Sequence, residues 1–291
     1  NPVSGKGAIR SKLSYIVENL STMGVVTVMP TKAKGDATNF VVENMDNFDT
    51  IICSGGDGTL NEITTGYMKV EKERRKPCGY IPAGTVNDFA TSLGISKNIN
   101  KCVDQILDSS IFPYDIGEFG DRYFNYIAGF GAFTEVSYMT PQDRKNVLGH
   151  QAYMLESVKS LTSIKSYQMK VTWEEGTLEG EFIFGMVTNT TSVGGFKGLI
   201  NQNVALDDGL FEVLLIRTPK TPLELSAIVS GLFLSDEPDS ELVYKFRTSS
   251  IEIQAEEEVD WVLDGEFGGS RTEVTIRNLP RCLNIRRNLD V

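Results

Sequence analysis

The 291 residues of the chain suit two domains of roughly 100–200 residues each, and a hydrophobic content of 41% is ordinary for a globular protein. The formal net charge of −11 excludes a general nucleic-acid binder and disfavours broad adsorption to anionic membranes, because both need clustered Lys and Arg. No apolar run approaches the roughly 20 residues that span a bilayer, and no signal-peptide pattern opens the chain. Because the first residue is Asn1 and not Met, we expect the natural chain to begin further upstream.

The first part of the chain, up to about residue 115, alternates helix-like and strand-like segments, which predicts a parallel sheet covered by helices. Residues 1–7 are expected to form a strand-to-helix loop. Apolar spacing and capping residues predict helices over 6–24, 36–45, 59–70, 87–94 and 98–110, and short apolar runs predict strands over 25–30, 49–54 and 78–84. Asp36 is the expected N-cap of the second helix, and Asn98 or Asn100 that of the last.

After residues 112–119 the pattern changes to alternating apolar and polar residues, typical of an antiparallel sandwich or barrel. This alternation predicts strands over 122–131, 166–173, 181–189, 210–217, 249–255, 259–266 and 272–278. Two helical insertions are expected, near 141–163 and at 221–234. The fold class is therefore an α/β domain followed by a mostly β domain.

The cysteine and histidine content limits the chemistry that is available. Four cysteines without CxxC spacing indicate reduced, buried thiols rather than disulfides or a zinc site. His150 is the single histidine, and its surroundings do not suggest a catalytic base, which removes most histidine-dependent mechanisms.

The stretch SGGDGTLNEI, residues 54–63, follows a predicted strand and opens a predicted helix. Bare backbone N–H groups at a helix N-terminus form an anion site, and glycine allows a phosphate to approach closely. Thr59 can add a hydroxyl, and Asp57 can hold Mg²⁺ between itself and phosphate oxygens. The alternative is an ordinary strand–helix turn with an Asp cap. The stretch lacks the spacing of a Walker loop, a protein-kinase glycine loop or a dinucleotide fingerprint.

Two further loops carry small and polar residues. One is the opening loop, with Ser4, Gly5 and Gly7, and the other is PAGTVNDFA at 82–90, with Gly84, Thr85, Asn87 and Asp88. Each loop alone is as compatible with a turn or a cap as with a ligand site. Because the carboxyl ends of parallel strands align, all three loops are expected to meet at one edge of the sheet.

The motifs NPVSGKG, TKAKGDA, SGGDGTLNEI, PAGTVNDFA, YDIG, LDDGLFEV and DGE occur in this order along essentially the whole chain. In this the chain resembles the diacylglycerol kinase catalytic superfamily, most closely the bacterial soluble diacylglycerol kinases and related lipid kinases, and more distantly sphingosine and ceramide kinases. NAD kinases share the GGDGT loop, but their Asn-Glu pair comes on a later segment, whereas Asn61 and Glu62 follow the loop directly here.

The resemblance implies a Rossmann-like, three-layer α/β nucleotide domain over residues 1–118, of the type shared by NAD kinases and diacylglycerol kinases. It also implies a mostly antiparallel β-sandwich domain over 119–281 that binds the lipid acceptor, and it allows residues 282–291 to return to the first domain. ATP and the acceptor are expected to meet between the two domains.

The resemblance also implies roles for particular residues. The expected nucleotide-binding residues are Asn1, Pro2, Val3, Ser4, Gly5, Thr31, Gly55, Gly56, Asp57, Gly58, Thr59, Leu60, Asn61, Glu62 and Thr85. Asp57, Asp88 and Asp115 are expected to organise water and active-site Mg²⁺. Glu266 is the expected catalytic base, assisted by Asp264. Asp208 and the carbonyls of Ala205 and Leu210 are expected to hold a second, structural Mg²⁺, although LDDGLFEV is also compatible with a plain turn.

The chemistry is consistent with this assignment. Phosphoryl transfer needs charge neutralisation, alignment and a group that accepts the hydroxyl proton. Without a candidate histidine, a carboxylate is the reasonable base, and Asp264 and Glu266 at alternate positions of an extended segment would face the same side. The alternative reading of DGE is a hairpin turn.

The sequence thus predicts a kinase, dependent on ATP and Mg²⁺, that phosphorylates the primary hydroxyl of diacylglycerol to give phosphatidic acid. The alternatives are a kinase for another hydroxylated lipid, such as phosphatidylglycerol or a sphingoid base, and a nucleotide-binding regulator without turnover. We expect a cytoplasmic protein with transient peripheral contact at the inner face of the membrane and no nucleic-acid partner, and a homodimer is one candidate assembly. The glycine-rich loop at 192–203 is a candidate membrane contact, and it is equally compatible with a mobile loop of no special role.

Overall fold

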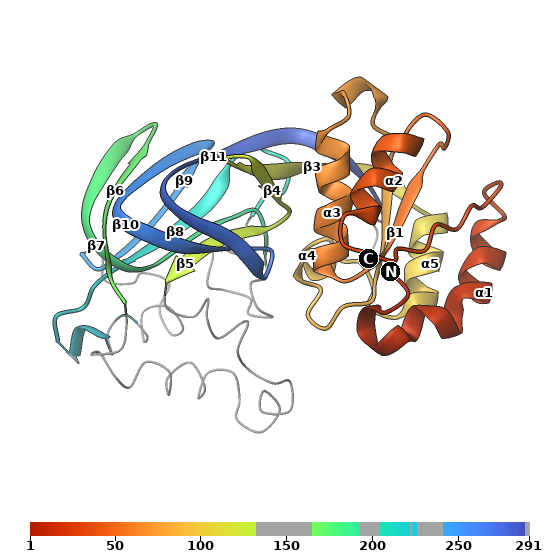
Figure 1. Cartoon of the computed structure of the whole chain (residues 1–291), viewed down its shortest axis with the longest axis horizontal. Coiled ribbons are helices and arrows are strands. Elements are labelled where there is room, and N and C mark those ends of the chain that lie inside the picture. The colour runs from red at the N-terminus through yellow and green to blue at the C-terminus, as the bar shows by residue number, and fades with distance from the viewer. Residues whose placement is uncertain (132–164, 192–203, 222, 226–227, 229–240, 289–291) are drawn as a thin grey trace.

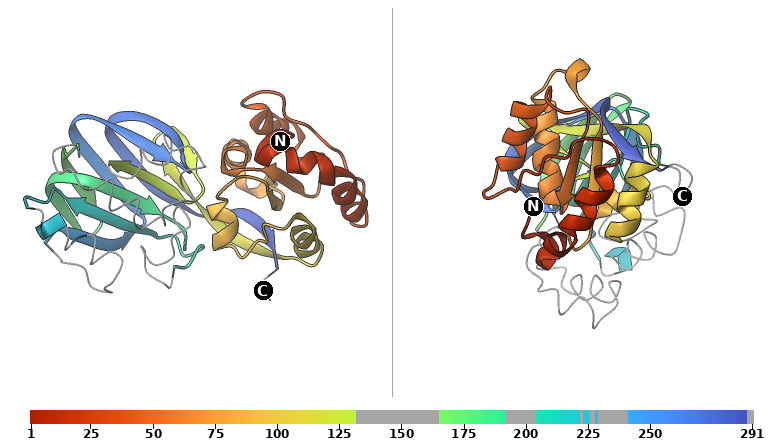
Figure 2. Two further views of the ribbon diagram at one scale, coloured as in Figure 1. Left: turned by 90° about the horizontal axis from the view of Figure 1, so that it is seen from below. Right: turned by 90° about the vertical axis from the view of Figure 1, so that its right-hand side faces the viewer.

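The computed structural model of the chain describes residues 1–131, 165–191, 204–221, 223–225, 228 and 241–288. The predicted helix at 141–163, most of the predicted helix at 221–234, His150 and the loop at 192–203 lie outside these residues. The helices gather at one end of the molecule and the long strands at the other, and strands β3 (Ser110–Phe119) and β11 (Glu266–Arg287) run between the two ends (Figures 1 and 2). The predicted combination of an α/β part and a β-rich part is confirmed.

The α/β end contains two parallel strands, β1 (Ile51–Gly55) and β2 (Cys78–Pro82), in register at Ile51 and Cys78. Its helices are α1 (Ala8–Leu20), α2 (Asp36–Asn44), α3 (Asp57–Met68), α4 (Asp88–Ser92) and α5 (Ile99–Leu107). Two short 3-10 turns lie at Ser4–Gly7 and Lys72–Arg74. Figure 1 shows α2 and α3 on one side of β1, with α1 and α5 on the other. All five predicted helices are confirmed.

The capping predictions have different outcomes. The Asn98 side chain accepts hydrogen bonds from the N–H groups of Asn100 and Lys101, so it caps α5 as expected. Asp36 is instead the first residue of α2, after Gly35, and its carboxylate accepts hydrogen bonds from the N–H groups of the preceding turn. The predicted N-cap was therefore wrong by one residue.

Residues 25–30 do not form the predicted strand. Within the part of the chain that the structure describes, β1 is the edge of the sheet, and this stretch does not pair with it. Val25 is 96% exposed and Val28 is 46% exposed, so the stretch buries little of the apolar surface that a strand needs.

The β-rich end is built from antiparallel strands. They are β4 (Arg122–Phe124), β5 (Ile127–Gly131), β6 (Tyr167–Trp173), β7 (Gly176–Thr188), β8 (Phe211–Arg217), β9 (Val243–Thr248) and β10 (Ser250–Leu263). β10 unites two of the predicted strands, and β9 was not predicted. Among the described residues all strands belong to one hydrogen-bonded sheet, whose main path is β1-β2-β11-β10-β5-β7-β8-β9.

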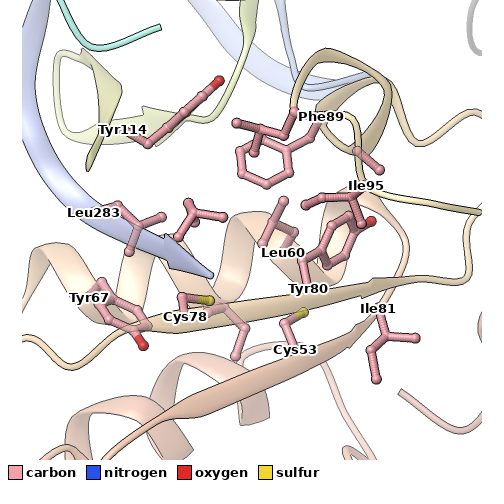
Figure 3. Packing of buried hydrophobic residues seen from close by; sticks show 14 of the residues in the cluster. Cys53, Leu60, Tyr67, Cys78, Tyr80, Ile81, Phe89, Ile95, Tyr114 and Leu283 are labelled. Atoms are coloured by element: carbon pink, nitrogen blue, oxygen red, sulfur yellow. The ribbon is translucent and has the colours of Figure 1, made fainter. Parts of the chain in front are cut away.

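Strand β11 joins the two ends of the molecule. Its first part pairs with β10, and its second part pairs with β3 and then reaches β2, where Ile285 lies opposite Cys78 in a parallel arrangement. Leu283 is fully buried in the core of the α/β end, and Figure 3 shows it beside Tyr67, Cys78 and Tyr114. The last strand of the chain therefore completes the core that the first hundred residues begin.

A second core fills the β-rich end. Trp261 is 1% exposed, and its ring packs edge-on against Phe119 and Phe130, with centroids 5.0 Å away in each case. The four cysteines are free and buried, as predicted. In the described part of the chain, no helix has the length and apolar content needed to cross a bilayer.

Because β11 supplies core residues to the α/β end, Leu283→Ala is expected to lower the free energy of unfolding by about 2–5 kcal/mol, through lost burial and the cavity that remains. Asn284→Ala, at the exposed neighbouring position, is the control and should change stability little. Denaturant unfolding of both variants measures the difference. Equal stability of the two variants would contradict the role given to β11.

Candidate active site

The three predicted loops meet at the carboxyl ends of β1 and β2. The Asn1 side-chain amide donates a hydrogen bond to Thr59 Oγ1 at 3.1 Å, and the N–H of Gly56 donates to Ser4 Oγ at 3.3 Å. The N–H of Asn87 donates to Asp57 Oδ2 at 3.1 Å. The first loop and the 82–90 loop thus both contact the GGDGT loop, as the parallel sheet predicts.

Glycine is required where these loops touch. A Cβ on Gly5 would lie 2.0 Å from the carbonyl oxygen of Ala83, and the φ of Gly5 is +56°. Gly56 and Gly84 face each other, so that a Cβ on Gly84 would lie 2.8 Å from the Cα of Gly56. Any side chain at these positions would push the loops apart.

Helix α3 begins inside the GGDGT loop, with Gly56 as its N-cap, and no side chain of the described residues caps it. Its first turn therefore presents unpaired N–H groups and the positive end of the helix dipole. The carboxylate of Glu266 lies against this turn, since a Cβ on Gly58 would be 2.3 Å from Glu266 Oε1. Two predicted site residues, about two hundred positions apart, are thus neighbours.

The DGE motif is a hairpin turn and part of the site at once. Asp264 and Gly265 have φ values of +50° and +84° and connect β10 to β11 where Leu263 pairs with Glu266, as in a type I′ turn. The expectation that Asp264 and Glu266 face the same side of an extended segment was wrong. Asp264 is 3% exposed within the turn, whereas Glu266 is exposed at the start of β11.

Five N–H groups hold the Asp264 carboxylate. Oδ2 accepts hydrogen bonds from the Asn61 side chain at 3.0 Å and from the backbone and side chain of Asn125 at 2.6 and 2.9 Å. Oδ1 accepts from the backbone N–H groups of Tyr126 at 2.9 Å and Ile127 at 3.3 Å. Burial raises the pKa of Asp264, and these donors oppose that shift because they favour the ionised form. Asp264 is therefore a structural anchor of the hairpin.

Asp57 lies among carboxylates. Burial, together with the negative charges of Asp264 and Asp88, raises its pKa to about 7. Its Oδ2 receives the Asn87 N–H, but its buried Oδ1 has no hydrogen-bond partner among the described residues. Asp88 is 3% exposed at the start of α4. An orphaned carboxylate oxygen beside two further acids is a site that a cation or a proton would satisfy.

The donor set fits an active-site Mg²⁺ that is brought by a nucleotide. Asp57 Oδ1 offers one hard oxygen ligand, and Mg²⁺ in kinases is commonly bound by one or two carboxylates together with substrate phosphates and water. No group of three or more His, Cys, Asp or Glu residues in the described part of the chain forms a metal cage by itself. The residues that would hold this ion are Asp57 and Asp88.

Asp115 lies elsewhere. Its Oδ1 and Oδ2 accept the backbone N–H groups of Arg281 and Gly209, each at 2.7 Å, and burial raises its pKa. Its carboxylate therefore contacts the loop around Asp208 instead of the Asp57 group. Asp208 itself is paired with Arg247.

The other predicted nucleotide residues occupy different positions around the three loops. Pro2 and Val3 lie in the first loop, where Val3 is 71% exposed, and Thr85 is exposed in the third. Thr31 lies in the connection between α1 and α2, a separate segment. Gly55 packs against Thr59, and Leu60 is fully buried in the core.

Sequence reasoning missed several residues of the site. Asn125 and Tyr126 lie on the connection between β4 and β5, and Tyr126 is buried close to the three acids, which raises its pKa. Lys97 Nζ donates to the Val86 carbonyl at 2.5 Å, and the N–H of the same peptide unit donates to Asp57. No local motif marks these residues, because their roles arise only where distant segments meet.

Comparison with known proteins agrees with the motifs. The model of the diacylglycerol kinase catalytic domain matches residues 1–119, and that of the YegS C-terminal NAD kinase beta sandwich-like domain matches residues 128–287. The diacylglycerol kinase of Bacillus subtilis (strain 168) is 32% identical over 272 residues, which cover 92% of this chain and 88% of that protein. The chain belongs to the diacylglycerol kinase family. The names of its relatives support a lipid kinase, and membership of a kinase family implies the use of ATP.

Other members of the family match over the full length of the chain. The diacylglycerol kinase of Staphylococcus saprophyticus subsp. saprophyticus is 31% identical over 294 residues, 100% of this chain and 92% of that protein. The crystal structure of a diacylglycerol kinase from Bacillus anthracis str. Sterne superposes with a TM-score of 0.79 at 26% identity, covering 100% of this chain and 96% of that one. An NAD kinase from Archaeoglobus fulgidus in complex with ATP, 16% identical with a TM-score of 0.51, shares the fold.

Gly58→Ala tests the contact between α3 and Glu266. The new methyl group would displace the Glu266 carboxylate, a flexible group that can move at little structural cost, while alanine favours the helix by up to about 1 kcal/mol. We expect kcat for phosphoryl transfer to fall by about ten- to a hundredfold with unchanged or higher thermal stability. Thr65→Ala on the same helix is the control. An unchanged kcat in Gly58→Ala would show that activity does not depend on the Glu266 carboxylate lying against Gly58.

Asp57→Asn tests the electrostatics of the site. The raised pKa means that the folded protein holds a proton more tightly than the unfolded chain, so Asp57 progressively destabilises the fold as pH rises from about 4 to about 7. Asp57→Asn lacks this effect, so its free energy of unfolding should exceed that of the parent by more at high pH than at low pH. Without Mg²⁺, this excess should grow by about 2 kcal/mol between about pH 5 and about pH 8.

Asp36→Asn is the matched control for this measurement. Hydrogen bonds from the Lys32 and Ala33 N–H groups lower the pKa of Asp36, so this carboxyl is ionised at both pH values and its loss should destabilise the protein to a similar extent at each. Thermal unfolding at both pH values measures the two signs. A destabilised Asp57→Asn at the higher pH would contradict the crowding of charge at Asp57.

Proposed function

We propose that the protein transfers the γ-phosphoryl group of ATP, with Mg²⁺, to the primary hydroxyl of diacylglycerol, giving phosphatidic acid. The observation that carries the proposal is the exposed carboxylate of Glu266 against the first turn of α3, in the loop that also contains Asp57. A proton acceptor and an anion-binding helix terminus are thereby adjacent, which is what transfer of a phosphoryl group to an alcohol requires.

In the proposed reaction the glycine-rich loop and the first turn of α3 bind the phosphates, with Ser4, Thr59 and Thr85 as hydroxyl donors from the three loops. Mg²⁺, when bound, neutralises charge on the phosphates. Glu266 accepts the proton of the lipid hydroxyl. At the same time the hydroxyl oxygen bonds to the γ-phosphorus, and the bond between that phosphorus and the leaving ADP oxygen breaks. Because Glu266 is exposed, it can then release the proton to solvent.

Asp264 and Asp57 have different roles from Glu266. Asp264 keeps the hairpin, and hence Glu266, at a fixed position relative to α3 through Asn61 and Asn125. Asp57 and Asp88 attract the cation that accompanies ATP. The proposed assistance of Asp264 in catalysis is therefore one of positioning.

Diacylglycerol as the acceptor rests on the names of the relatives, several of which are called diacylglycerol kinase at 31–32% identity. A kinase of the same mechanism acting on phosphatidylglycerol or a sphingoid base is the second candidate. We further propose a cytoplasmic protein that contacts the inner face of the membrane peripherally to reach its lipid. The homodimer stays a prediction.

Glu266→Gln tests the proposed base. Transfer of labelled γ-phosphate from ATP to diacylglycerol, phosphatidylglycerol and sphingosine in mixed micelles measures both the acceptor and the mechanism. We expect the parent to phosphorylate diacylglycerol, and the variant to lose at least about a hundredfold in kcat with little change in the KM for ATP.

Glu273→Gln, at an exposed position on the same strand, is the matched control and should retain parent activity. Equal transfer by the parent and Glu266→Gln would remove Glu266 as the base. Transfer by the parent to another lipid alone would overturn diacylglycerol as the acceptor, and transfer to no lipid would favour a regulator without turnover.

A further inference from the structure

The loop that precedes β8 is the place where the family resemblance implies a structural Mg²⁺, bound by Asp208 and the carbonyls of Ala205 and Leu210. In the structure both oxygens of Asp208 are already engaged. Oδ1 accepts the N–H of Leu210 at 3.0 Å, and Oδ2 forms an ion pair with the guanidinium of Arg247, from β9.

Arg247 also forms an ion pair with a second carboxylate. Its Nε lies 3.2 Å from Oε1 of Glu212, whose side chain is 5% exposed. Glu212 Oε2 is buried without a partner among the described residues. One guanidinium therefore bridges two acids, Asp208 on the loop and Glu212 on β8, in the manner of a cation between two ligands.

A second arginine holds the other acid of the loop. Arg281 Nη2 lies 3.3 Å from Oδ2 of Asp207, and its Nε donates to the Asp207 carbonyl at 3.0 Å. The backbone N–H groups of Arg281 and Gly209 hold Asp115 beneath the loop. Each acid around the loop thus already has a partner that is an arginine or a backbone N–H.

This arrangement does not fit Mg²⁺. The ion needs near-octahedral oxygen ligands at about 2.1 Å and gives up its water reluctantly, so it cannot take an Asp208 oxygen that a guanidinium already contacts. A positive charge at Arg247 would also repel a divalent cation at contact distance. Asp208, the one side chain that the resemblance assigns to the ion, therefore has a different cation beside it.

We infer that Arg247 is the resident cation of the 205–210 loop, linking Asp208 to Glu212, and that the loop binds no Mg²⁺. The loop is then held independently of divalent metal, while Mg²⁺ acts only where ATP binds. The inference concerns the stability and metal content of the loop, so its failure would leave the proposed reaction unaffected.

The test compares the parent with Arg247→Lys, which keeps the charge, and with Arg247→Met, which removes it. All are made in an Asp57→Asn background, so that metal at the active site is not counted. Thermal unfolding without nucleotide is measured in excess EDTA and in millimolar Mg²⁺. Arg277→Met is the matched control, because the exposed Arg277 pairs with one acid among the described residues, Glu118.

We expect the melting temperature of the proteins that retain Arg247 to be the same in EDTA and Mg²⁺. Arg247→Met should melt about 3–6 °C lower in EDTA, because two carboxylates lose their shared counter-charge, and Arg247→Lys should recover part of that loss. Arg277→Met should change the melting temperature by less than about 1 °C.

Tightly bound Mn²⁺, counted by electron paramagnetic resonance, gives a second readout. We expect no bound Mn²⁺ in the protein that retains Arg247. In Arg247→Met we expect Mn²⁺ to bind between Asp208 and Glu212, and the additional change Asp208→Asn should abolish this binding. Bound Mn²⁺ or a Mg²⁺-dependent rise in melting temperature with Arg247 present, lost in Asp208→Asn, would overturn the inference. So would an Arg247→Met variant as stable in EDTA as the protein that retains Arg247.

Discussion

The site depends on one buried carboxylate, Asp264, and the five N–H groups that surround it. These donors come from α3, from the connection between β4 and β5 and from the first residue of β5, so the hairpin that carries Glu266 is bound to both ends of the molecule. A carboxylate with five donors and little exposure cannot be moved without breaking charge-assisted hydrogen bonds in a region that water does not reach. The position of the proposed base is set by this constraint.

The second constraint is the accumulation of negative charge. Burial, together with the charges of Asp264 and Asp88, raises the pKa of Asp57 to about 7, and Glu266 lies at the adjacent helix turn. Such crowding costs stability in the free protein, and the cation that we propose to arrive with the nucleotide would relieve it. Under the proposed function, the crowded acids would favour binding of a metal–nucleotide complex over the empty site.

The two acidic regions of the molecule balance charge in different ways. Around Asp57 the described residues leave one carboxylate oxygen without a partner, which suits an ion that comes and goes with substrate. Around Asp208 the ion pairs with Arg247, and beside it those of Arg281, supply counter-charge within the chain. We propose that the first arrangement takes part in catalysis and that the second stabilises the loop that leads into β8.

The sequence by itself determined the five helices of the α/β end, most of the strands, the change from an α/β to a β pattern, and the three glycine loops, because these follow from local periodicity and turn chemistry. It also marked DGE, through the Asp-Gly turn and the family motif, although it misplaced Asp264 relative to Glu266. Only the tertiary structure showed that residues 25–30 have no strand partner, that β11 completes the first core, and that Asn125, Tyr126 and Lys97 belong to the site. It also separated Asp115 from Asp57 and paired Asp208 with Arg247. These outcomes depend on contacts between segments far apart in the chain, and neither periodicity nor a short motif carries information about which distant side chain will be a carboxylate's partner.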